Sequence, residues 1–334
     1  MNYNEYNLPV AKMYQWTASV ERQLGTNMEA EIAYVASHGA NLAFPADINQ
    51  IPVAKLSPNF SQLNTPYPQF GTIEGVVGAS VSNYNSLQLQ VNRRFSGGLT
   101  FNANYVWAHF LDDQDSAGWG GRGGTQVYQN AYDPAANYGN SNFDVRNALK
   151  GSVVYQLPLG KGRRFLNDNP YLDAFVGGWQ TSATMVVHSG QPFTVVTANN
   201  NSAADNPNAG GADNATQYPD VIGNPHLSHP NIQNWYNVAA FAQPAGGTFG
   251  DERRNSLVGP DLSEIDFSLG KNFALREGIG LQFRIDGYNI FNHPSFGIPN
   301  TGVAFANGAP TSVSSITSTS IGPRQFQLNA RISF

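Results

Sequence analysis

The chain has 334 residues, a formal net charge of −5, six His and no Cys. Charged residues make up only 12% of the chain, about half of their share in a typical soluble domain, while glycine and aromatic residues are abundant. This composition excludes disulfide frameworks and cysteine-based zinc sites, and without a Lys/Arg-rich run it gives no sign of a nucleic-acid partner.

Neither a membrane-spanning helix nor an export signal is found in the sequence. No stretch approaches about 18 consecutive apolar residues, which excludes a transmembrane helix. The first residues, MNYNEYNLPVAKM, lack the basic and then apolar pattern of a signal peptide. If the protein is exported, we therefore expect its N-terminal signal to lie outside this chain.

The first predicted elements form a β-hairpin. Apolar residues alternate with polar ones along 16–21, and the alternation resumes along 29–34 after the turn at 24–27. A second and clearer hairpin pairs 86–92 with 99–107 across the Gly-rich turn Ser96-Gly97-Gly98. Each of its strands has roughly 11 residues, about twice the ordinary length and enough for a tilted strand to cross a bilayer.

Five further segments repeat this period-two alternation, and with them the sequence predicts about nine strands. They cover 152–157, 179–187, 264–269, 281–286 and 325–334. The connections between the predicted strands alternate in length. Short or medium connections lie near 24–27, 96–98, 158–175 and 273–279, and long ones near 38–83, 111–146, 189–262 and 292–322.

This alternation is typical of transmembrane barrels, which have short periplasmic turns and long extracellular loops. It places Phe334 on the periplasmic side. The sequence therefore predicts an all-β fold, a portion of an antiparallel transmembrane β-barrel. A soluble β-sandwich with its polar faces in water is the alternative. Strand length, loop alternation, the Asn, Gln, Ser and Thr side chains on the polar face and the aromatic last residue favour the membrane.

The two faces of the predicted strands carry different candidate residues. Four charged residues fall on the polar faces of adjacent strands, where we expect them to line the lumen and form cross-strand ion pairs. They are Glu264, Asp266, Arg284 and Asp286. Five aromatic residues lie near strand ends on the apolar faces, where barrels carry membrane-interface girdles and soluble proteins would pack a core. They are Tyr34, Trp107, Tyr155, Trp179 and Phe334.

The long connection after residue 111 holds the candidate ligand-binding residues. Asp112, Asp113 and Asp115 crowd three carboxylates into four positions, a cluster that hard cations favour. The spacing breaks the EF-hand pattern, however, so a solvated acidic loop is the alternative and no metal is predicted. Trp119 and Arg122 are residue types that often anchor a bound sugar or peptide, or else they pack the loop on itself.

Enzyme signatures are absent from the sequence. No GxSxG, HExxH or Walker A motif occurs, and no pair of carboxylates is placed convincingly for glycoside hydrolysis. His226 and His229 are flanked by Pro225 and Pro230, so no helix would align the two rings on a metal. We therefore expect no catalytic residues, no metal and no cofactor.

A series of short motifs runs through most of the chain. They are 16–22 (WTASVER), 33–39 (AYVASHG), 84–88 (YNSLQ), 143–147 (FDVRN), 157–162 (LPLGKG), 178–180 (GWQ), 189–193 (SGQPF), 291–294 (FNHP) and the terminal Phe334. In their order and spacing the chain resembles TonB-dependent outer-membrane receptors, specifically the Oar-like subgroup with a carboxypeptidase-regulatory-like N-terminal domain.

The resemblance implies a function as well as a fold. The chain would form the barrel wall and extracellular loops of a receptor that imports a nutrient, such as a siderophore, an oligosaccharide or a peptide, across the bacterial outer membrane. The implied partners are outer-membrane lipid, a plug domain, the TonB complex and the barrel-assembly machinery, which reads the aromatic end at Phe334.

The chain departs from the family in what it lacks. Such receptors carry a plug domain, a TonB box and about 22 strands, whereas this sequence predicts about nine strands and no plug. We therefore expect residues 1–334 to be the C-terminal part of a receptor barrel, with the plug and the N-terminal signal absent. Two other functions stay open: a non-transporting surface or adhesion protein of the outer membrane, and a soluble β-rich glycan-binding protein.

Overall fold

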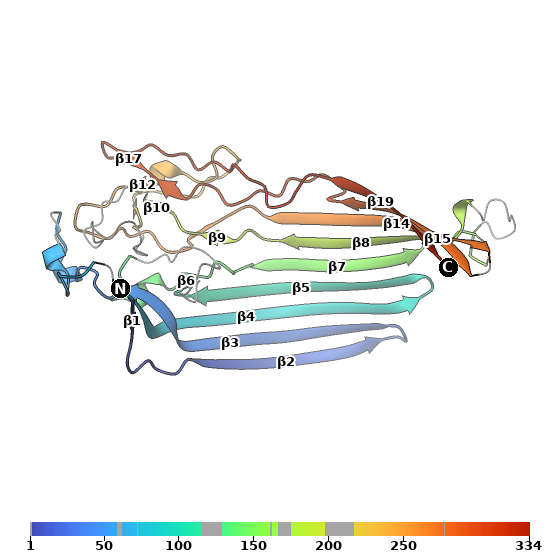
Figure 1. The fold of residues 1–334 in the computed structure, drawn as a ribbon, viewed down its shortest axis with the longest axis horizontal. Helices are drawn as coiled ribbons and strands as arrows, with labels where there is room; N and C mark the ends of the chain where they lie inside the picture. Colours follow the sequence, from blue (N-terminus) through green and yellow to red (C-terminus); the bar gives the residue numbers. More distant parts are fainter. Residues whose placement is uncertain are drawn as a thin grey trace.

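The chain folds into one large antiparallel sheet with folded loops at one end (Figure 1). The computed structural model describes residues 2–58, 62–71, 73–114, 129–160, 162–165, 175–197, 217–276 and 278–334. Within these ranges no α-helix is long and apolar enough to cross a membrane. The predicted all-β fold is confirmed.

Nine long strands make up the sheet, and each pairs with the next one along the chain. They are β2 (Lys12–Leu24), β3 (Met28–Asp47), β4 (Glu74–Ser96), β5 (Leu99–Asp112), β7 (Asn147–Gln156), β8 (Trp179–His188), β14 (Leu262–Arg276), β15 (Ile279–Tyr288) and β19 (Gln325–Ser333). Two short strands extend it: β1 (Asn2–Asn4) pairs in parallel with β4, and β6 (Gly139–Asn140) pairs with β5. In the described residues, β2 and β19 form the two edges.

The register gathers the apolar residues on one face of the sheet. Residues that pair across strands share a face, and one such row contains Val20, Ile32, Leu89, Tyr105 and Leu149. This apolar face is largely open: Trp107 keeps 55% of its surface exposed and Leu328 keeps 69%. A soluble protein seldom exposes so extensive an apolar surface, whereas a bilayer covers one.

Short turns join the strands at the sheet end that carries the C-terminus, on the right of Figure 1. Gly97 and Gly98 connect β4 to β5 with φ angles of 61° and 86°. Two successive residues of positive φ define the tight turn that best matches the twist of paired strands, and glycine adopts them without steric cost. A Cβ on Gly98 would also lie 3.1 Å from the carbonyl oxygen of Gln156.

The expectation of a loop over 38–83 is wrong at both of its ends. β3 continues to Asp47 and β4 already begins at Glu74. Register shifts occur between Gly39 and Leu42 and again between Leu42 and Ala43, next to Asn41 with its φ of 55°. Such a bulge interrupts the alternation of side chains while the backbone pairing goes on, so the period-two pattern ends before the strand does.

The opposite end of the sheet carries a folded unit that we call the loop cap, residues 189–197, 217–261 and 289–324. Its short elements are β9 (Pro192–Phe193), β10 (Val196–Thr197), β11 (Asp220–Val221), η4 (Val238–Ala240), β12 (Phe241–Ala242), β13 (Leu257–Val258), β16 (Gly302–Val303), β17 (Phe305–Ala306) and β18 (Ala309–Pro310). Pairing of β9 with β13 and of β10 with β16 ties these distant segments together. Three further short helices lie outside the cap: η1 (Val53–Lys55), η2 (Gln62–Asn64) and η3 (Pro134–Asn137).

A hydrophobic core lies inside the loop cap. Its buried members are Phe193, Val195, Tyr236, Ala240, Phe241, Leu257, Val303 and Phe305. Tyr236 contacts Phe241 edge to face, with ring centroids 6.0 Å apart. The described parts of the connections predicted as loops, residues 189–197, 217–261 and 292–322, therefore pack as a small domain, because burial of these side chains offsets the entropy lost on ordering the chain.

Replacing Phe241 with Ala should loosen the loop cap and leave the sheet intact. Phe241 is fully buried, and such a truncation costs about 3–5 kcal/mol. Hydrogen exchange should speed up in residues 217–258 and stay unchanged in β4 and β5. Ile222→Ala serves as the control because Ile222 is 68% exposed. Equal exchange in the two variants would contradict the assigned core.

Candidate functional site

The four charged residues predicted to line a lumen share the polar face of β14 and β15. Ser268 pairs with Asp286 and Gly270 with Arg284. Glu264 and Asp266 alternate with the apolar Ile265 and Phe267 of the same strand. The faces are therefore as the period-two pattern predicted.

The expected cross-strand ion pairs are not formed. Arg284 Nε lies 3.0 Å from Asp286 Oδ2 on its own strand, and Asp266 accepts a hydrogen bond from the backbone nitrogen of Asn289. The register explains the difference, because Arg284 stands opposite Gly270, four positions and about 13 Å along the strand from Asp266. Asp286 is held further by Asn329 Nδ2, which donates to Oδ2 at 2.7 Å.

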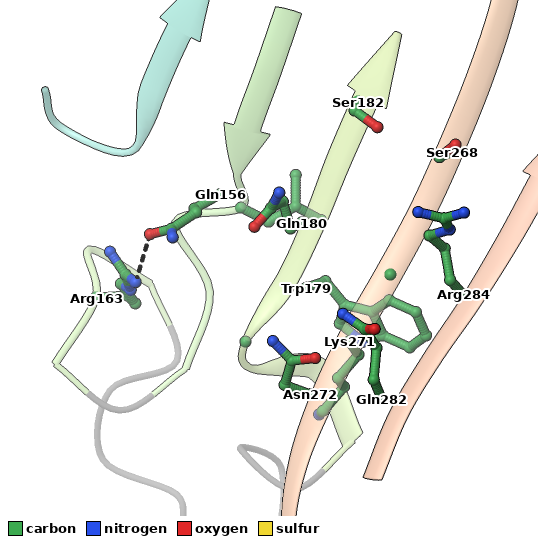
Figure 2. Close-up of a pocket in the computed structure, with 13 residues that line it drawn as sticks. Gln156, Arg163, Trp179, Gln180, Ser182, Ser268, Lys271, Asn272, Gln282 and Arg284 are labelled. Atoms are coloured by element: carbon green, nitrogen blue, oxygen red, sulfur yellow. Dashed lines mark hydrogen bonds between the residues drawn. The ribbon is translucent and has the colours of Figure 1, made fainter. Parts of the chain in front are cut away.

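The lower pocket lies on this polar face toward the turn end and has a volume of about 220 Å³. Figure 2 shows its lining side chains gathered from neighbouring strands. Its polar groups include Gln156, Gln180, Ser182, Ser268, Asn272 and Gln282. Two cationic residues, Arg163 and Arg284, join them, and among the described residues no carboxylate lines the pocket. Lys271 also borders it, but Lys271 pairs with Trp179 in an apolar row, so its side chain lies on the other face of the sheet. Arg163 donates to Gln156 at 2.9 Å.

The upper pocket lies on the same face near the loop end, also with about 220 Å³. Tyr84 and Phe110 meet edge to face in its wall, with centroids 5.9 Å apart, and Phe143 lies at its border with 57% of its surface exposed. Val106, Ala108 and Ala148 complete an apolar surface, and Asn104 and Lys150 add polar groups.

Sequence reasoning missed the upper pocket, although a signal for it exists. In residues 105–111 (YVWAHFL) the polar-face positions hold Val106, Ala108 and Phe110, whereas the other polar-face positions of the strand hold Thr, Asn or Asp. The apolar run therefore marks a place where the polar face is interrupted. Its meaning depends on Tyr84 and Phe143, which only the tertiary structure brings alongside.

The connection that carries Phe143 is held firmly. Asp144 is buried, accepts a hydrogen bond from the Phe110 backbone nitrogen at 2.8 Å and pairs with Arg146 at 3.0 Å. Asn140 and Asn255 exchange side-chain to backbone hydrogen bonds, which join this connection to the loop cap. The rim of the upper pocket is thus fixed by backbone-directed contacts.

Two of the predicted ligand contacts, Asp112 and Asp113, bind the protein itself. Asp112 forms a buried ion pair with Arg254, whose Nε also donates to the Asn137 carbonyl at 2.8 Å. Asp113 accepts from the Ser80 hydroxyl and from the Val81 nitrogen. Burial raises the pKa of Asp113, and these hydrogen bonds oppose the rise.

The remaining ligand candidates, Asp115, Trp119 and Arg122, lie outside the described residues. A ligand-binding role for these three, and for Asp112 and Asp113, stays a prediction. Within the described ranges, no group of three or more His, Asp or Glu side chains is arranged to hold a metal ion.

The aromatic residues of the predicted girdles occupy the apolar face at two levels. Tyr34 shares a row with Leu87 and Trp107 toward the loop end, and its hydroxyl donates to Asn85 at 2.7 Å. Tyr155 and Trp179 lie at the turn end, where Phe334 also ends the chain.

Trp179 also has a cationic neighbour. The ammonium of Lys271 lies 5.8 Å from the Trp179 ring and 4.9 Å from the Phe273 ring. This buried cation fits a membrane boundary, where a long basic side chain rests on aromatic rings. A girdle role for the five aromatic residues nevertheless remains a prediction.

Comparison with known proteins places this geometry in context. Residues 1–327 match the family described as outer membrane beta barrel domain. No curated protein matches the chain. Among solved structures, the outer membrane transporter YddB from Escherichia coli shares 10% identity and a TM-score of 0.48, over 99% of this chain and 34% of that one. The FrpB iron transporter from Neisseria meningitidis shares 10% identity and a TM-score of 0.43, over 100% and 33%. The chain thus spans about a third of each transporter.

Replacing Arg254 with Met should detach the loop cap from the end of β5. The side chains of Arg254 and Asp112 are 1% and 5% exposed, and a carboxylate left alone at such a buried site costs about 3–5 kcal/mol. Exchange should therefore rise in 129–145 and 217–258 and recover partly in the double variant with Asp112→Leu. Arg253→Met is the matched control, since Arg253 is exposed. The same exchange in both single variants would refute the ion-pair assignment.

The loop cap should become less stable as the pH rises, through Glu252. This side chain is buried beside the Ser256 hydroxyl, and burial raises the pKa of Glu252 above its ordinary value of 4.5 despite that hydrogen bond. When the pKa of an acid is higher in the folded state than in the unfolded state, the folded state is favoured at a pH below the unfolded-state pKa. That contribution to stability is lost as the pH rises through the folded-state pKa. In Glu252→Gln, cap protection measured from about pH 4 to pH 8 should not show this decline. An unchanged decline would contradict the assignment.

Proposed function

Because the chain belongs to the outer membrane beta barrel domain family and therefore lies in the bacterial outer membrane, we propose that it is part of a nutrient receptor. The chain would form the barrel wall and outer loops of a TonB-dependent receptor, of the Oar-like kind suggested by its motifs. The apolar face would meet outer-membrane lipid, and the polar face would line the lumen. The other strands of the barrel and its plug domain would lie outside residues 1–334.

The observation that carries this proposal is the arrangement of two pockets on one polar face. The upper pocket lies near the loop end of the strands, and the lower pocket lies toward the turn end. A ligand that moves along the face would find binding groups at both ends of its path. The lower pocket, with Arg163 and Arg284, would attract an anionic group, and the upper pocket would attract an apolar group.

Import in such a receptor requires no bond-making chemistry, so the proposal includes no enzyme activity. The ligand would be a siderophore, an oligosaccharide or a peptide captured between the loops and the polar face. The TonB complex would then act on the plug and release the ligand inward. Phe334, the exposed aromatic end of the chain, would be read by the barrel-assembly machinery.

A surface or adhesion protein without transport is the second candidate function. The observation that favours it is the loop cap, because an independent hydrophobic core makes these loops rigid enough to present a binding surface. Such a protein would need the cap and the membrane anchor but no path along the polar face.

The test uses cells that express the full-length protein with a tag inserted between 199 and 216. We expect heat-modifiable migration, fractionation with the outer membrane and tag exposure on intact cells. Uptake of a labelled ferric siderophore, oligosaccharide or peptide should require the protein and should be lost without TonB. Surface exposure with no uptake of any class would favour adhesion. A soluble protein without a heat shift would overturn the proposal.

A further inference from the structure

We propose that the upper pocket binds an aromatic acid, a small molecule with a flat apolar ring and one anionic group. This inference rests on the proposed function only for the biological role of the pocket: a molecule bound there would be the imported ligand or the part of it that the receptor recognises. The pocket itself stands on the described residues. Its wall is aromatic, its floor is apolar and a single cation stands beside them.

The aromatic wall provides the site for a ring. Tyr84 and Phe110 meet edge to face at 5.9 Å, and Phe143 exposes 57% of its surface at the same pocket. Aromatic rings favour edge-to-face and offset contacts with another ring, each worth more than the area that it buries. A flat ligand would therefore cover rings that otherwise face water in a polar surround.

The volume of the pocket suits a small aromatic molecule. Its volume is about 220 Å³, whereas an apolar protein cavity of about 150 Å³ holds one benzene molecule. One ring with a substituent, or two fused rings, would fit. The hydroxyls of an oligosaccharide would find few hydrogen-bond partners among Val106, Ala108 and Ala148.

Lys150 gives the pocket its preference for an anion. It is exposed on the polar face of β7, directly across from Asn104, and both line the pocket. Within the part of the chain that the structure describes, no carboxylate forms an ion pair with Lys150. A ligand carboxylate between Lys150 and the Asn104 amide would gain a charge-assisted hydrogen bond.

The other charges near the pocket do not cancel Lys150. Asp144 also lines the pocket, but it is buried and neutralised by Arg146 at 3.0 Å. Glu264 stands in the same cross-strand row as Lys150, with Val186 between them, which separates the two by about 10 Å. The local balance at the pocket is therefore one positive charge.

The test measures binding of 2-naphthoate and of neutral 2-naphthalenemethanol to the full-length protein purified in detergent, by titration calorimetry. We expect the naphthoate to bind and Lys150→Met to weaken it about tenfold, with less than about threefold change for the neutral alcohol. Phe143→Ala should weaken both probes, because it removes ring contact and leaves the charge. Arg331→Met removes an exposed cation of the same polar face on β19 and should change neither affinity.

Heat-modifiable migration of each variant shows that it is folded. If naphthoate does not bind to the folded wild-type protein, the inference is overturned. This result is expected where another segment of the full-length protein fills the pocket. Equal naphthoate affinity in wild type and Lys150→Met would also overturn the inference. The outcome is separable from that of the transport test. If naphthoate binds but no TonB-dependent uptake is found, the aromatic-acid site is supported and the import function is contradicted. If uptake is found but naphthoate does not bind, the import function is supported and the site is contradicted.

Discussion

The structure depends on the requirement that every backbone donor and acceptor within a bilayer be paired inside the protein. The seven inner strands meet it by pairing on both sides with their neighbours in chain order, and β2 and β19 pair on one side each within the described residues. The same pairing determines the side-chain surfaces, since a slip of one residue would exchange the faces of a strand. Both the apolar face, with Trp107 and Leu328, and the polar face, with its pockets, follow from one register.

Above the membrane the constraint changes, because water is available to backbone groups and strands no longer need to continue. There the chain is ordered by a core of its own around Phe241 and by a few buried polar contacts. The most demanding of these is the Asp112–Arg254 pair, which joins the end of a strand to a segment far along the sequence. Two charges removed from water are stable there only together, so they make the position of the cap specific.

The upper pocket lies where these two regimes meet. The residues of its floor lie in the sheet, and the strand register determines their positions. Phe143 lies in a connection that hydrogen bonds of Asp144 and Asn140 hold in place. The Tyr84–Phe110 contact stabilises the pairing of β4 with β5, but it also leaves apolar side chains on an otherwise polar face. Their cost is understandable if a ligand covers them, which is the physical basis for assigning the pocket a binding role.

The sequence by itself determined the number of long strands, their two faces and the order of short turns and long loops. Period-two alternation is a local property, so it can be recognised without knowing which strands pair with one another. It placed Glu264, Asp266, Arg284 and Asp286 on one face for the same reason. It could not give their ion pairs, since the offset of Arg284 from Asp266 depends on the register between strands. Only the tertiary structure decided that Asp112 meets Arg254, that the long connections share a core, and that Tyr84, Phe110, Phe143 and Lys150 surround one pocket. Those contacts join residues far apart in the chain, and no local pattern encodes which distant partner a buried side chain will meet.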